Sequence, residues 1–146
     1  MYCSPAELEQ AIPRDTLIQL SSDDPSAYEP DASVVNDALQ FAGELIDAHL
    51  RGRYTLPLQE VPTVVRDMAR TLARYWLYSR RPEGDLPEVV KDSYRATVKT
   101  LENIRDNKLT LGIATTQTDM PESSEFRVSA PRPRFSGRGG LLEKYR

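Results

Sequence analysis

Apolar residues recur at helical spacing in three long segments of the chain. The first segment begins at Asp31, a candidate N-cap, ends near Arg51, and has apolar positions at Val34, Val35, Ala38, Phe41 or Ala42, Leu45, Ile46 and His49. The second runs from Thr63 to Arg80, with Val64, Val65, Met68, Leu72, Tyr75, Trp76 and Ser79 on one stripe. The third runs from Pro87 to about Asn107, with Val89, Val90, Tyr94, Val98, Leu101 and Ile104 expected to face inward. These patterns predict three long amphipathic helices.

Shorter elements precede them. The residues from Ser4 to Glu7 form a capping-box pattern with proline at the first helical position, so a short helix is predicted up to Pro13. Residues 15–20 predict a second short helix or turn, and residues 21–30 a polar loop. The fold class predicted is therefore all-α, a small bundle of about four main helices.

The connection between the first two long helices contains glycine and proline. Gly52 is a candidate C-terminal cap, and Pro57 and Pro62 are expected to keep the chain extended. Gly52 and Pro57 together set the turn, so this loop is expected to fix the angle between the helices. The side chains of Tyr54, Leu56 and Leu58 would then pack on the core or on a neighbouring molecule.

The composition changes after Ile113. Residues 114–134 hold few apolar groups, so this segment cannot bury enough surface to fold alone. We therefore divide the chain into a helical domain, residues 1–113, and a flexible linker with an extended C-terminal arm, residues 114–146. The arm offers arginines and apolar anchors that are expected to fold onto a partner, namely Arg132, Arg134, Phe135, Arg138, Leu141, Leu142 and Tyr145.

Bulk properties limit the classes of protein that fit. A length of 146 residues favours one domain, and no apolar run approaches the ~20 residues of a membrane helix. The N-terminus lacks a signal-peptide pattern, and the single Cys3 fits a reducing compartment. No membrane association is expected.

Charge is distributed unevenly along the chain. Residues 1–50 carry ten acids and one base, whereas residues 51–106 carry eleven bases and eight acids. One acidic and one basic face would suit head-to-tail contacts between identical copies. The alternative is two solvated faces without a partner.

Candidate chemistry is sparse. One histidine and one cysteine, far apart in sequence, do not match the common zinc spacings, and the acids do not match a calcium loop. Residues 137–140 are glycine-rich but lack the phosphate-loop lysine spacing, and His49 is expected to cap or pack at a helix end. We predict no catalytic residue, cofactor or metal, and hence no enzyme.

Three arginines spaced by four residues, Arg66, Arg70 and Arg74, form one basic ridge, which we call the arginine ridge. Its expected partners are acids, either within the chain or on another copy. With Arg53, Tyr54 and Tyr78 it makes up the predicted intersubunit set. A small helical DNA-binding or regulatory protein is the alternative, which the acidic first third of the chain disfavours.

The order of these motifs resembles a known family. The resemblance rests on the capped segment 4–8, on 17–20, on 44–47 and above all on the loop 53–58, which is followed by Val61-Pro62 and by helix residues 73–75 and 77–78. It continues through 94–104 and 109–112, with a terminal pattern of arginine, phenylalanine, serine and leucine at 133–141. Together these are similar to the phage Mu-like head–tail connector proteins. Here the loop 82–87 and the linker 114–131 differ from the family pattern, and Arg138, Gly139 and Gly140 replace its usual Arg-Asp.

The resemblance implies a structural virion protein. Such adaptors form a ring beneath the portal, typically a dodecamer, which extends the DNA channel and docks the next neck or tail-terminator protein. Viral DNA would pass through without sequence recognition, and a negative wall would favour sliding. The expected location is the neck of the virion, after synthesis in the bacterial host cytoplasm.

Overall fold

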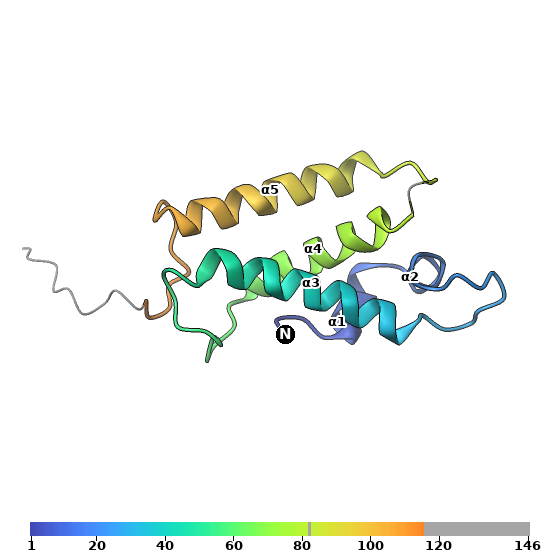
Figure 1. Cartoon of the computed structure of the whole chain (residues 1–146), viewed down its shortest axis with the longest axis horizontal. Helices are drawn as coiled ribbons and strands as arrows, with labels where there is room; N and C mark the ends of the chain where they lie inside the picture. The colour runs from blue at the N-terminus through green and yellow to red at the C-terminus, as the bar shows by residue number, and fades with distance from the viewer. Residues whose placement is uncertain (82, 116–146) are drawn as a thin grey trace, which may run out of the picture.

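The computed structural model describes residues 1–81 and 83–115 and contains five helices and no strand within them (Figure 1). These are α1 (Pro5–Ala11), α2 (Arg14–Ser21), α3 (Ala32–Leu50), α4 (Thr63–Ser79) and α5 (Glu88–Arg105). The all-α prediction is confirmed, with three long helices and two short ones.

Helix starts follow the predicted capping chemistry. At α1 the Ser4 backbone N–H donates to the Glu7 carboxylate (2.7 Å) and the Glu7 N–H donates to the Ser4 hydroxyl (3.3 Å). Hydrogen bonds from the Ser4 backbone and side chain to the Glu7 carboxylate hold the pKa of Glu7 below its ordinary value. At α3 the Asp31 carboxylate accepts the N–H of Ser33 (2.9 Å), which satisfies one of the free donors of the first turn.

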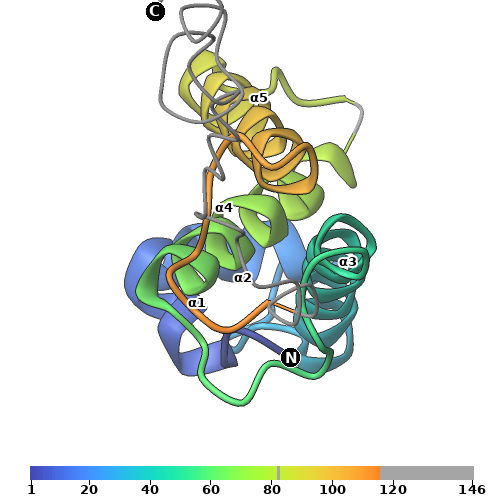
Figure 2. The same cartoon turned by 90° about the vertical axis from the view of Figure 1, so that its left-hand side faces the viewer.

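The core forms mainly where α3 and α4 pack against each other, and α5 covers both of them (Figure 2). Small residues are among the buried positions of α3 and α4; they are Ala38, Ala42, Gly43, Ala69 and Ala73. Larger side chains fill the remaining space, including Leu39, Ile46, Leu50, Val65, Leu72, Leu77, Leu101 and Ile104.

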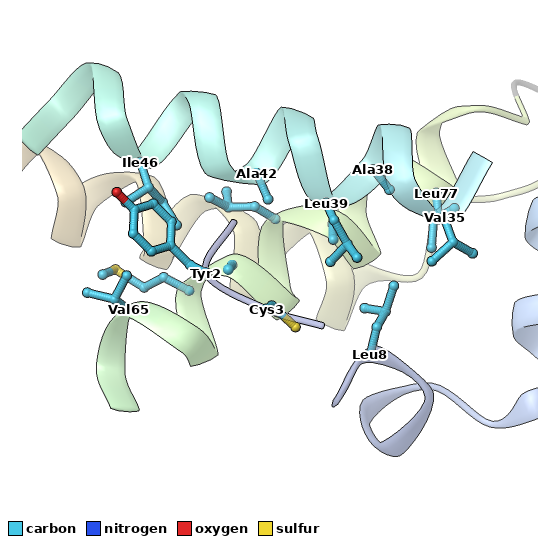
Figure 3. Close-up of a cluster of buried hydrophobic side chains, with 14 of the residues drawn as sticks. Tyr2, Cys3, Leu8, Val35, Ala38, Leu39, Ala42, Ile46, Val65 and Leu77 are labelled. Atoms are coloured by element: carbon cyan, nitrogen blue, oxygen red, sulfur yellow. The ribbon is translucent and has the colours of Figure 1, made fainter. Parts of the chain in front are cut away.

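The N-terminal residues belong to this core. Figure 3 shows Tyr2 beside Ile46, and Leu8 close to Val35 and Leu77. The Tyr2 hydroxyl donates to Asp47 of α3, and burial together with this bond holds the pKa of Tyr2 well above its ordinary value. The first residues of the chain therefore fix α1 against α3 and α4.

Most positions of the predicted apolar stripes in α4 and α5 are buried or packed against the core, but a few are exposed. In α4 the side chain of Val65 is buried whereas Val64 is exposed, and Ser79 is also exposed. In α5 the side chain of Val90 is 1% exposed whereas that of Val89 is 67% exposed. Adjacent residues on a helix lie about 100° apart, so only one valine of each pair can face the core.

The turn after α3 also differs from the prediction. Gly52 does not adopt the left-handed conformation of a glycine cap, which among the described glycines is found only at Gly112 (φ 73°). Instead the N–H groups of Arg53 and Tyr54 both donate to the Leu50 carbonyl (2.9 Å each). The Leu56–Pro57 peptide bond is cis.

Candidate interaction surface

The arginine ridge lies on the side of α4 that faces α1 and solvent. Arg66 pairs with Glu7 of α1 (3.9 Å), and Arg70 pairs with Asp67 one turn earlier on α4. Both acids belong to the same subunit. The predicted salt bridges of Arg66 and Arg70 are therefore met within the chain.

Arg74 is different from the other two ridge arginines. Its Nε is buried without a hydrogen-bond partner, and no acid among the described residues pairs with its guanidinium. The guanidinium carbon lies 5.8 Å from the ring centroid of Tyr78, within the range of a cation–π contact. Arg74 is thus a positive charge held in place by an aromatic ring but not neutralised.

A hollow of about 230 Å³ opens beside this side chain. It is lined by Ala11, Asp67, Arg70, Thr71 and Arg74. One acid and two arginines leave the lining with an excess positive charge, so the hollow suits a negatively charged group.

The outer side of α3 carries the opposite charge. Asp37 and Glu44 are exposed, and neither pairs with a cation among the described residues. The Glu44 carboxylate accepts a hydrogen bond from the Gln40 amide (2.9 Å). We call Asp37 and Glu44 the acidic strip. The uneven charge of the sequence indicated an acidic region but not that these two residues would remain unpaired on one face.

Arg80 and Arg81, at the end of α4, make contacts within the chain. Arg80 donates to the carbonyls of Leu20 (3.2 Å) and Ser21 (3.1 Å) and pairs with Asp23 (2.9 Å). Arg81 pairs with the same Asp23 (3.6 Å). The two arginines therefore fasten the loop that connects α2 to α3.

The structure places Arg53 and Tyr54 inside the subunit. The Arg53 guanidinium donates to the carbonyls of Ile104 and Leu109 (2.9 Å for the latter), at the end of α5. The Tyr54 hydroxyl accepts the N–H of Leu111 (2.9 Å), and 1% of the Tyr54 surface is exposed. Both side chains are buried within the protein, and the intersubunit role of these two residues stays a prediction. They join the loop after α3 to the chain that follows α5.

The remaining polar candidates have internal roles. The Nδ1 of His49 donates to the Leu45 carbonyl of its own helix (2.8 Å). Burial raises the pKa of the Cys3 thiol to about 11, and nearby Glu7 adds to the rise. In the described ranges, no group of three or more metal-ligating side chains could hold a metal ion. None of the helices there is long and apolar enough to cross a membrane.

The predicted anchors of the arm lie outside the described residues. They are Arg132, Arg134, Phe135, Arg138, Leu141, Leu142 and Tyr145. Their partner-binding role and the division of the chain at residue 113 stay predictions. Tyr78 is half-buried beneath Arg74 and stays in the predicted intersubunit set together with the arginine ridge.

Fold and surface together define an all-α protein that presents opposite charges on different helices. The model of the family described as "Bacteriophage Mu, Gp36" matches residues 2–130, and the chain belongs to this family. It is 32% identical to "Gene product J" of Escherichia phage Mu over 109 residues, which cover 74% of each chain. It is 33% identical over 90 residues to "Mu-like prophage FluMu protein gp36" of Haemophilus influenzae, covering 62% of this chain and 61% of the relative. The chain is thus a Mu-like phage protein.

Proposed function

We propose that this protein is a head–tail connector subunit of a Mu-like phage. Copies assemble into a ring under the portal, extend the DNA channel and dock the next neck or tail protein. Membership of the phage Mu family supports the setting, and the resemblance in the loop 53–58 supports the connector role.

One observation carries this proposal furthest. Among the described residues, one arginine on α4 and two acids on α3 lack an ion-pair partner, so different patches of opposite charge are available on one molecule. A closed ring of identical subunits needs such a heterologous interface, in which two different patches meet on each neighbour.

The same charges argue against the DNA-binding alternative. Electrostatic binding to DNA requires cations that are free to replace counterions. Four of the five arginines between residues 66 and 81 already contact acids of the subunit, namely Arg66, Arg70, Arg80 and Arg81. We expect no salt-sensitive retention of duplex DNA in an electrophoretic shift, and clear retention would favour the alternative.

The connector proposal is tested on phage heads that carry portal protein. Full-length protein added to such heads is expected to appear as a ring at the portal vertex by cryo-electron microscopy. Its absence from particles that have both portal and tail would overturn the proposal.

The role of the arm is tested with the same heads. Deletion of residues 131–146 should leave helical content unchanged and abolish binding to the portal vertex. Binding equal to that of the full chain would show that the arm is not the docking element.

A further inference from the structure

We propose that the hollow beside Arg74 receives a carboxylate from the acidic strip of a second copy, so that α4 of one subunit docks on α3 of the next. This deepens the connector proposal and rests on it, because it names the surfaces through which copies of the chain meet.

The first support is the state of Arg74. A buried N–H without an acceptor is costly, and folded proteins seldom retain one without compensation. Tyr78 contacts the guanidinium and holds it at the surface of α4. Because Nε itself is buried, an incoming carboxylate would accept hydrogen bonds from the two Nη groups in a two-pronged geometry, for which arginine is better suited than lysine.

The second support is the shape and charge of the hollow. Its volume of about 230 Å³ is enough for the end of an acidic side chain. Asp67 is already engaged by Arg70, which leaves the charge of Arg74 for the guest. Thr71 is occupied as a donor to the Asp67 carbonyl (3.0 Å), so Arg74 is the main donor facing the opening.

The third support is the match in spacing. Asp37 and Glu44 are seven residues apart on α3, a rise of about 10.5 Å along the helix. Arg66 and Arg74 are eight residues apart on α4, a rise of about 12 Å. Two helices laid side by side can therefore bring one acid opposite Arg74 and the other opposite the half-exposed Arg66, which would then share its charge with Glu7.

The placement of the helices makes the contact head-to-tail. Glu7 of α1 pairs with Arg66 of the arginine ridge, whereas Asp37 and Glu44 are exposed positions on α3. One subunit cannot bring its own strip to its own ridge. Each copy then offers a ridge to one neighbour and a strip to the other, which generates a ring or a filament.

The experiment uses charge reversal in the full-length protein. The ridge variant is Arg66→Glu with Arg74→Glu, and the strip variant is Asp37→Arg with Glu44→Arg. Either variant alone should weaken self-association by at least about tenfold, because like charges then face each other. The control Arg95→Glu with Lys99→Glu, on exposed positions of α5, should associate like the wild type.

Combination of the variants is the decisive step. An equimolar mixture of ridge and strip variants should co-assemble, since acidic patches of one then meet basic patches of the other. A single chain carrying all four reversals should also recover association. Circular dichroism and thermal unfolding check that each variant is folded. Recovered association then reports the pairing of opposite charges between copies.

Association is followed by sedimentation velocity and by occupancy of portal-bearing heads. Variants that match the wild type in both measurements, or a mixture that fails to recover in both, overturn the inference. If wild type and variants occupy heads equally, the connector proposal stands and this interface falls. If the charge pattern governs association but no protein joins heads, the interface stands and the connector proposal falls.

Discussion

Tyr54 shows how one side chain can connect distant parts of the chain. Its hydroxyl accepts the N–H of Leu111, 57 residues later, while its ring is fully buried beside the end of α3. The neighbouring Arg53 donates hydrogen bonds to the carbonyls of Ile104 and Leu109. These two carbonyls lie on either side of Asn107, which has a positive φ of 62°. The loop 53–58, which carried the strongest sequence resemblance, therefore connects the end of α3 to the chain that follows α5.

We expect Tyr54→Phe to lower the free energy of unfolding by about 1–2 kcal/mol, because a largely buried N–H loses its acceptor. Chemical denaturation measures the change, and hydrogen exchange at Leu111 should accelerate. The matched control is Tyr28→Phe at a side chain that is 89% exposed, where no change is expected. Equal effects at the two positions would contradict the role assigned to Tyr54.

Cys3 gives a prediction for pH dependence. Its folded pKa of about 11 exceeds the ordinary value of 9.0, so the folded state holds the thiol proton more tightly than the unfolded state. This stabilisation is fully present below pH 9 and is lost as pH rises towards 11. Thermal unfolding of the wild type across this window should show a steeper alkaline loss than Cys3→Ala does, and parallel curves would refute the assignment.

Arg74 should stabilise the assembly rather than the subunit. We expect Arg74→Met to leave the Tm of the free subunit unchanged or raise it by a few degrees, because a donor without an acceptor is removed. The same variant should weaken self-association. A Tm lowered by about 4 °C or more would instead indicate that the contact with Tyr78 stabilises the fold.

At the scale of the elements, helix positions could be predicted from sequence better than helix faces. Caps at Ser4 and Asp31 and breaks at prolines fixed the helix starts to within about a residue. The faces were less certain because Val64 and Val65, like Val89 and Val90, fit the periodicity equally well. Alanines were also ambiguous, yet Ala69 and Ala73 are buried in the core that α4 shares with the helices packed against it.

The two valines of α5 make a matched test of its orientation. Val90→Ala should destabilise the protein by about 1–3 kcal/mol, because it removes buried methyl groups and leaves a cavity. Val89→Ala, at an exposed position, should change stability by less than about 0.5 kcal/mol. Urea unfolding of both variants measures the difference, and the reverse order would place the opposite face of α5 against the core.

At the scale of the whole molecule, the candidate surface was only partly predictable. The spacing of Arg66, Arg70 and Arg74 placed them on one ridge, as the helix confirms. Which arginine would lack a partner depended on tertiary structure, since Glu7 reaches Arg66 from a helix 59 residues away in sequence. The positions of Arg53 and Tyr54 likewise depended on where α5 ends, which no local pattern indicates.

Salt should separate the stability of the subunit from that of the assembly. Surface ion pairs contribute little to folding, so raising the ionic strength should change the Tm of the free subunit only slightly. Association through the ridge and the strip should weaken, because salt screens the attraction between these exposed charges on separate molecules. Sedimentation at low and high salt measures this, and association that strengthens with salt would point to an apolar interface instead.

The burial of Tyr2 and Leu8 has a consequence for biosynthesis. These residues leave the ribosome before α3 and α4, yet the side chains that cover them belong to those two helices and are made dozens of residues later. At about 5–20 residues per second, the N-terminal segment waits for seconds without its partners. The bundle is therefore expected to close late in translation as one cooperative unit, and a nascent chain cut before α4 should remain sensitive to protease.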